Sequence, residues 1–284
     1  MKLSAQQLEH VERALDYIES HLQVPVRVED ISQHVGYSLF HFCRIFNAAT
    51  YISPYTYLMR RRISEAALQV LQSKRRLTDI AVDFGFQSSE VFGRSIKRLF
   101  GVLPSELRKT GILDPRLLLP ALSGEKILSW QKFQGFTLIK EELPALKLFG
   151  LMTHWKDCDI SALRAIFYDN NQAGTLSPSA LVGVRFYPKH WSVRGRYCFA
   201  GYPLPEDVTE IPEWFVEKSF KSQSCLITSQ WVSPENIDAL LEYYHCVWFP
   251  NASYRADVPF LLERMPVENQ VQIIWPAREK KQPA

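Results

Sequence analysis

Two copies of one sequence pattern flank a single helical stretch, and this repeat constrains the fold more than any other feature. The copies are Val28–Pro54 and Leu77–Pro104. At an offset of 49 residues, Asp30, Ile31 and Gly36 of the first copy match Asp79, Ile80 and Gly85 of the second. At an offset of 50, Phe42, Arg44 and Pro54 match Phe92, Arg94 and Pro104. Such a repeat indicates one supersecondary unit that occurs twice.

Each copy has the pattern of two short helices joined by a tight turn. The first helix of each copy ends at a glycine, Gly36 or Gly85, and glycine suits the left-handed corner of a helix–turn–helix. Ser38 and Ser88 are suited to begin the second helices, because a serine hydroxyl accepts from the free amides of a first turn. In the second copy, several side chains are expected to face outward: Ser89, Glu90, Gly93, Arg94, Lys97 and Arg98.

The stretch between the copies, Pro54–Ser73, is predicted to be one long helix, with proline at its first turn and apolar residues every three to four positions. A helix of about 20 residues is about 30 Å long. Successive major-groove faces of DNA lie about 34 Å apart. One chain could therefore hold two DNA readers about one turn apart, and a monomer would read an asymmetric site. The run Arg60–Arg62 is interpreted as a solvated face or as a phosphate contact.

Positive charge is concentrated around the repeat. Gln33–Lys109 carries 12 Lys/Arg against 5 Asp/Glu, a net +7, whereas Thr110 to the end carries 18 against 19, a net −1. A basic block beside a neutral one favours a nucleic-acid module joined to something else, with a solvated basic surface as the alternative.

Composition and motifs exclude several classes. Hydrophobic content of 46% indicates a folded chain, and 284 residues allow two domains. The five scattered cysteines lack CxxC spacing, which argues against a zinc site or disulfide framework and favours a reducing cytoplasm. The first ten residues have no signal-peptide core, and no apolar run is long enough to span a membrane. No HExxH, GxSxG or P-loop motif is present, so we expect no catalytic residues, metal or cofactor.

Residues from about 5 to 109 resemble the AraC/XylS family of transcription regulators, and within it the Rob-like branch. The signature is carried by Gly85, Phe86, Ser88, Phe92, Arg94, Lys97, Gly101, Pro104 and Arg108, and by GYSLFHFCRIF in the first copy. The resemblance implies an all-α domain with two helix–turn–helix subdomains joined by a long helix. It also implies promoter DNA and RNA polymerase as partners.

The predicted DNA-binding residues lie on the second helix of each copy: Phe40, His41, Cys43, Arg44, Ser88, Ser89, Glu90, Arg94 and Lys97. Arginine can donate twice to guanine, and a glutamate accepts from cytosine. Phe40 contacts a thymine methyl or packs internally, and His41 is expected at a phosphate or in solvent. Related regulators carry Trp and Gln where this chain has Phe40 and Cys43, so a different operator is expected.

After a linker at residues 111–135, the chain alternates strands and helices to residue 279. The order is strand–helix–strand–strand, twice, with a last helix running to about Cys246. This predicts an α+β domain with pseudo-twofold symmetry at residues 136–279, beside a DNA-binding domain at 1–110.

The second half resembles the GyrI-like effector-binding domain, through Ala145–Leu151, Leu181–Tyr187 and Pro259–Pro266. In that family a glutamate faces a bound small molecule, which implies Glu263 here. We add Trp214, Tyr197 and Trp231 as effector-binding candidates, because a carboxylate among aromatic rings suits apolar or cationic ligands. The alternatives are core packing for the rings, and for Glu263 a surface salt bridge with Arg264 or another base.

The sequence thus predicts a cytoplasmic DNA-binding transcription regulator, an activator of stress or drug-efflux genes that acts as a monomer and responds to a small molecule. The alternative is a GyrI-like protein that sequesters or hydrolyses a small molecule and carries an accessory DNA module.

Overall fold

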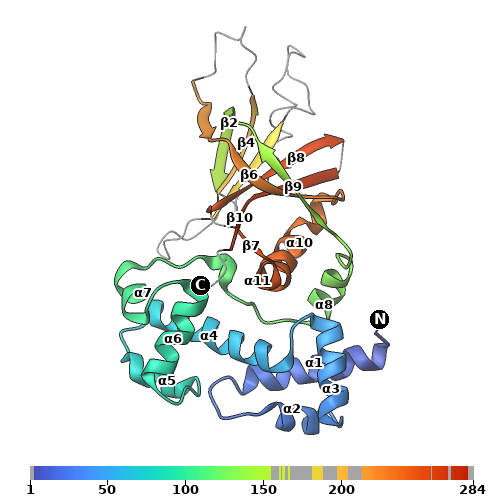
Figure 1. The fold of residues 1–284 in the computed structure, drawn as a ribbon, viewed down its shortest axis with the longest axis vertical. Coiled ribbons are helices and arrows are strands. Elements are labelled where there is room, and N and C mark those ends of the chain that lie inside the picture. Colours follow the sequence, from blue (N-terminus) through green and yellow to red (C-terminus); the bar gives the residue numbers. More distant parts are fainter. Residues whose placement is uncertain are drawn as a thin grey trace. The chain divides into compact units, whose positions relative to one another are not determined.

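The computed structural model describes residues 3–154, 160, 162–163, 166, 181–187, 197–203, 213–256, 258–267 and 270–280. These residues form two compact units (Figure 1). The helical unit contains the described residues up to 134 together with Ala239–Trp248, and the sheet unit contains the other described residues of the second half. No helix in the described part of the chain is long and apolar enough to cross a membrane.

The helical unit contains eight described α-helices before residue 134. They are α1 (Ala5–Ser20), α2 (Val28–His34), α3 (Leu39–Thr50), α4 (Pro54–Gln72), α5 (Leu77–Asp83), α6 (Ser89–Phe100), α7 (Pro104–Thr110) and α8 (Gly124–Gln131). A short 3₁₀ turn, η1 (Pro115–Leu117), precedes α8. The predicted double helix–turn–helix is confirmed as α2–α3 and α5–α6, with α4 between them.

Local sequence signals set these helix ends. The hydroxyls of Ser38 and Ser88 accept from the amides of His41 and Val91, three residues on. Both corner glycines are left-handed, with φ of +77° at Gly36 and +73° at Gly85.

Each second helix packs one face into the core: Phe42, Ile45 and Phe46 of α3 and Phe92 and Ile96 of α6 are buried, whereas Val91 and Leu99 are half-buried. Gly93, assigned outward, has little exposed surface of its own in α6. A Cβ atom placed on it would meet nothing within 4 Å, so the position itself faces open space, as expected.

A segment from far along the chain completes the helical unit. Helix α10 (Ile237–Tyr243) continues as a π-helix, η4 (Tyr244–Trp248), and residues from Ala239 onward belong to this unit. The Tyr243 ring lies 5.7 Å from the ring of Tyr51, 6.4 Å from Trp130 and 6.2 Å from Phe133. These contacts tie the segment to the end of α3 and to α8, whereas the sequence assigned it wholly to the second domain.

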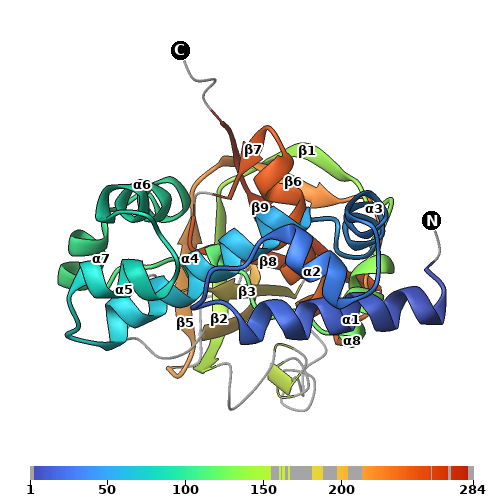
Figure 2. The same cartoon turned by 90° about the horizontal axis from the view of Figure 1, so that it is seen from below.

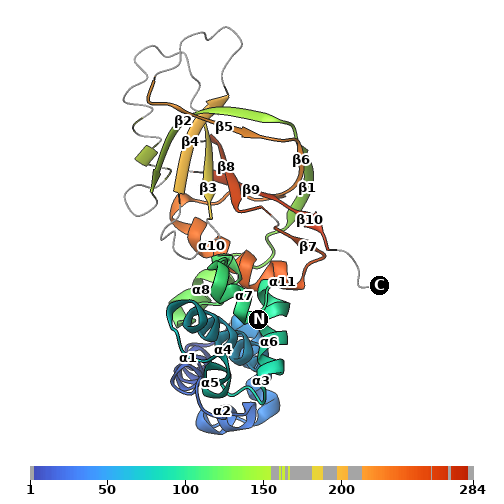
Figure 3. The same cartoon turned by 90° about the vertical axis from the view of Figure 1, so that its left-hand side faces the viewer.

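The sheet unit is built around one eight-stranded antiparallel sheet that curls strongly (Figure 3). Its strands are β1 (Leu138–Leu143), β2 (Leu146–His154), β3 (Val182–Phe186), β4 (Tyr197–Pro203), β5 (Val216–Phe220), β6 (Gln223–Thr228), β8 (Phe260–Val267) and β9 (Gln270–Pro276). A separate ribbon pairs β7 (Tyr254–Arg255) with β10 (Arg278–Glu279). The predicted α+β character of this half is confirmed.

The strand order is β1-β6-β9-β8-β3-β4-β2-β5. One apolar cluster, which includes Val184, Phe199 and Leu262, covers one face of the sheet. A second cluster, with Cys198 and Ala200, lies on the other face together with Ile160 and Leu163. Of residues 160–170, only Ile160, Ala162, Leu163 and Ile166 lie within the described residues, and these are helical.

Candidate nucleic-acid interface

The outer surface of α3 is largely apolar at its beginning. The Phe40 side chain is 79% exposed and Leu39 is also exposed. Phe40 therefore does not pack into the core, which leaves its ring free to meet a partner. Arg44, one turn further on, is exposed as well. The two residues together offer an apolar face and a guanidinium on one helix.

His41 and Cys43 are half-buried on the same helix. The His41 ring makes an edge contact with Tyr37, at 4.7 Å between centroids. Burial, and then the nearby Glu29 carboxylate, raise the pKa of the Cys43 thiol. The thiol is therefore neutral at physiological pH and is only a weak hydrogen-bond donor.

The outer surface of α6 is charged. Ser89, Glu90, Arg94 and Lys97 are exposed, while Ser88 is half-buried because its hydroxyl caps the helix. A hydrogen bond from Ser88 is the main cause that lowers the pKa of Glu90. Glu90 is consequently ionised and can act only as an acceptor.

Helices α3 and α6 lie at opposite ends of α4, as two perpendicular views show (Figures 1 and 2). Helix α4 has 19 residues, and at 1.5 Å per residue it is about 29 Å long. This length is close to one helical turn of DNA, about 34 Å.

The arginine run of α4 does not face solvent. Arg61 and Arg62 are buried. The Arg60 Nη1 group donates to the carbonyl oxygen of Cys246, in the π-helix, at 2.5 Å. Burial lowers the pKa of Arg60. The interpretation of this run as a solvated face is wrong, because α4 is enclosed by other parts of its own unit.

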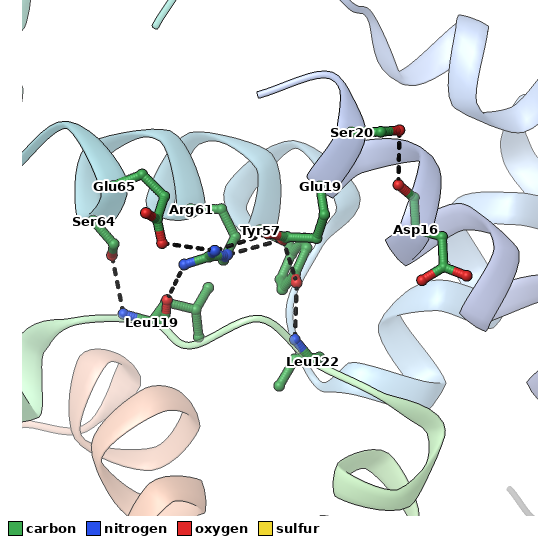
Figure 4. A network of polar contacts seen from close by, with 9 residues as sticks. All are labelled: Asp16, Glu19, Ser20, Tyr57, Arg61, Ser64, Glu65, Leu119 and Leu122. Atoms are coloured by element: carbon green, nitrogen blue, oxygen red, sulfur yellow. Dashed lines mark hydrogen bonds and ion pairs between the residues drawn. The ribbon is translucent and has the colours of Figure 1, made fainter. Parts of the chain in front are cut away.

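Arg61 is the centre of a polar network that joins α1, α4 and the segment before α8 (Figure 4). Its guanidinium donates twice to the Glu19 carboxylate, at 2.8 and 2.7 Å, and once to Glu65 at 2.9 Å. It also donates to the Leu119 carbonyl at 2.7 Å. The Tyr57 hydroxyl donates to Glu19 at 3.0 Å. Four acceptor atoms from three elements bind this one cation, so Arg61 holds α1, α4 and the segment before α8 together.

The neighbouring Arg62 donates through Nε to the Leu22 carbonyl at 3.0 Å and through Nη2 to the Val24 carbonyl at 2.6 Å. Both acceptors lie between α1 and α2. Burial lowers the pKa of Arg62. Backbone carbonyls thus hold this cation in the interior.

A second basic run, Lys74–Arg76, does face solvent. Arg75 forms an ion pair with Asp83 at 2.7 Å, in which the Arg75 side chain remains 45% exposed. This run directly precedes α5, so its cations border the second helix–turn–helix.

In the sheet unit, Glu263 lies on β8 and is only 1% exposed. Its carboxylate accepts from Nε of Arg185, on the neighbouring strand β3. Arg185 also donates to Asp238, at 2.9 Å, in the first turn of α10. A base does pair with Glu263, as one alternative expected, but the pair is internal and the base is Arg185.

The four effector-binding candidates do not gather on one face. Glu263 pairs across the sheet with Gly183, which pairs with Ala200, so these residues share a face. Tyr197 is three positions from Ala200 on β4 and therefore lies on the opposite face, since strand residues alternate. Trp214 and Trp231 are 69% and 42% exposed. They offer ring surface to solvent, and the structure does not bring them against Glu263.

No cluster of three or more possible metal ligands occurs among the described residues. The four cysteines in the described part, Cys43, Cys198, Cys225 and Cys246, are free thiols. Arg185 and Arg60 carry no local sequence signal as interior residues, because their partners are distant in the chain. The periodicity of α4 could have pointed to Arg62, which lies four residues from the buried Leu58 and Ala66 and so shares their face.

Comparison with known proteins matches residues 31–110 to a family of helix–turn–helix domains. The transcriptional activator AarP of Providencia stuartii is 33% identical over 115 residues, which are 40% of this chain and 85% of AarP. The regulator YbfP of Bacillus subtilis is 36% identical over 98 residues, which are 34% of this chain and 33% of YbfP. This chain therefore spans about a third of the length of YbfP.

Among solved structures, an AraC-type transcriptional regulator from Chromobacterium violaceum aligns with a TM-score of 0.35 and 23% identity, over 38% of this chain and 96% of that one.

Proposed function

Because the chain belongs to the AraC-type helix–turn–helix transcriptional regulators, we propose that it binds promoter DNA through α3 and α6, one in each of two successive major grooves. The observation that carries this proposal is that Arg44 and Arg94 are exposed at equivalent positions of α3 and α6, two helices that lie at opposite ends of α4 (Figure 2). A helix fits the major groove, and arginine donates twice to guanine. A single chain then reads an asymmetric site as a monomer.

The residues proposed to touch DNA divide into two groups. Arg44, Arg94 and Glu90 read base edges, and Phe40 contacts a thymine methyl. The remaining candidates bind phosphate or position the helices: His41, Cys43, Ser88, Ser89 and Lys97. The domain boundaries 1–110, 111–135 and 136–279 are part of the same proposal.

The test is a gel shift with DNA selected in vitro from a random pool by the full chain. A protein that neutralises about 6–10 phosphates loses about 10³–10⁵ in affinity between 50 and 200 mM salt. We expect such a loss, together with preference for the selected sequence over random DNA. A flat salt response would contradict DNA binding.

We further propose that the second half is a GyrI-like domain that senses a small apolar or cationic molecule near Glu263. The strand order supports this, because its halves β5-β2-β4-β3 and β1-β6-β9-β8 are arranged alike. A ligand that draws Glu263 away from Arg185 would change the partner of Asp238, where α10 begins. The later residues of α10 belong to the helical unit, which offers a route from effector to DNA binding.

Binding of a lipophilic cation, tetraphenylphosphonium, to wild type and Glu263→Gln tests the effector site. We expect a loss of roughly tenfold or more, because the variant removes the charge. Equal affinity would remove Glu263 from the site. The fluorescence of Trp214→Phe and Trp231→Phe, compared with wild type, would report which exposed ring lies near the ligand.

Activation of transcription in the cytoplasm, through contact with RNA polymerase, completes the proposal. The name of AarP, a transcriptional activator, supports activation, and the Rob-like resemblance supports stress or drug-efflux genes as targets. Run-off transcription from a bound promoter, with and without the protein, measures the direction of the effect. Lower transcript yield would indicate a repressor. The alternative of an enzyme with an accessory DNA module is not favoured by the matched family.

A further inference from the structure

One buried side chain of α4 links the segment before the first helix–turn–helix copy to the corner of the second. Arg62 is 6% exposed, and its guanidinium donates to the carbonyl oxygens of Leu22 and Val24, which lie between α1 and the first copy. A Cβ atom placed on Gly85, at the corner of the second copy, would lie 3.3 Å from Nη1 of Arg62 and 3.5 Å from Cζ. The guanidinium therefore packs directly against the backbone of the second corner.

The equivalent corner of the first copy has no such neighbour. A Cβ atom on Gly36 would meet nothing within 4 Å. Both glycines have the same left-handed conformation, with φ of +77° and +73°. The contact with Arg62 is thus specific to the second copy and is not a requirement of the turn itself.

The Arg62 guanidinium has a well-defined position. Its planar fork is held at two points, by the carbonyl oxygens of Leu22 and Val24. It therefore offers the second corner a rigid surface rather than the end of a mobile side chain.

We propose that Arg62, packed against Gly85, sets the orientation of α6 relative to α3 and thereby the spacing of the two DNA segments that the chain reads. This inference rests on the proposed DNA-binding function. Adding one base pair to B-DNA rotates the next major-groove segment by about a tenth of a turn. A small tilt of the second copy would therefore change which spacing is preferred.

The test uses the full chain and DNA selected in vitro by the wild type, with one base pair inserted or deleted between the two recognised segments. Wild type is expected to prefer the selected spacing by roughly tenfold or more, comparable to the effect of a mismatched base pair. In Gly85→Ala and Arg62→Lys, this preference should fall to about twofold or move by one base pair, because the new methyl displaces the guanidinium and lysine lacks its fork.

Gly36→Ala is the matched control. It carries the same strain of a left-handed alanine but meets no guanidinium, so it should lose similar thermal stability and keep the wild-type spacing. Melting curves of every variant separate unfolding from reorientation.

Two results would overturn the inference and leave the proposed function intact. One is that Gly85→Ala and Arg62→Lys both keep the spacing preference of the wild type, and the other is that Gly36→Ala changes this preference as much as they do. If the wild-type chain selects no DNA at all, both the proposed function and the inference are wrong.

Discussion

The two helix–turn–helix copies share a backbone plan and differ in the chemistry that they expose. Helix α3 presents the ring of Phe40 with Arg44, whereas α6 presents Glu90 with three cations, Arg94, Lys97 and Arg98. Apolar contacts read thymine methyls and depend little on salt, whereas cations near phosphates release counterions. We therefore expect the two copies to recognise DNA by different chemistry, one at each end of a single site.

The largest effect is expected when the copies are turned relative to each other. One alanine inserted after Ala67, within α4, rotates everything beyond it by about 100°. Only one copy could then reach its groove, so affinity for the selected site should fall roughly 10³-fold, toward that for random DNA. Binding is measured by gel shift. An alanine inserted between Gln134 and Gly135, outside both copies, is the control, and equal losses would show that the copies do not act together.

The next largest effect is expected on stability, when the polar network around Arg61 in α4 is broken. Arg61→Ala leaves Glu19 partly buried without its cation, and breaking such a pair costs about 3–5 kcal/mol. Amide exchange should rise in both copies, since α4 supports both. Arg75→Ala, which removes an exposed ion pair, should cost under about 1 kcal/mol. Loss of protection in the first copy alone would show that the copies unfold independently.

Substitution of one arginine on α3 or on α6 should alter sequence recognition at one end of the DNA site only. Arg44→Ala and Arg94→Ala should each cost about 1–3 kcal/mol in binding and relax specificity at one end. In vitro selection with each variant gives the altered positions. Uniform weakening on every sequence, random DNA included, would mean that these arginines bind phosphate only.

The smallest expected effect is on the salt dependence of binding, which distinguishes the charged surface of α6 from the apolar surface of α3. Lys97→Gln should reduce the slope of log affinity against log salt by about 1, whereas Phe40→Ala should weaken binding and leave the slope unchanged. Affinities at four salt concentrations are sufficient for both. A changed slope in Phe40→Ala would break the contrast drawn between α3 and α6.

The sequence was sufficient for features that depend on local chemistry. The offset of 49 to 50 residues identified the copies, and the serine caps and corner glycines located their helices. The alternation of strands and helices to residue 279 also predicted the α+β character of the second half. These signals act over a few residues and can be read without the fold.

Features that depend on distant partners could not be read in this way. Arg60, Arg61 and Arg62 formed a basic run, and such a run is ordinarily solvated, but their acceptors are Cys246, Glu19 and Leu22. The pairing of Arg185 with Glu263 was hidden for the same reason. No local pattern reports which segment will cover a helix, so burial of these cations follows only from the assembled unit.

A hydroxyl-radical footprint of the full chain on its selected DNA tests the central claim most directly. The account predicts one chain per site and two protected segments on one face of the DNA, about 10–10.5 base pairs apart. Backbone protection should weaken at one segment in Arg44→Ala and at the other in Arg94→Ala. A single protected segment, or a palindromic pair bound by two chains, would contradict the account.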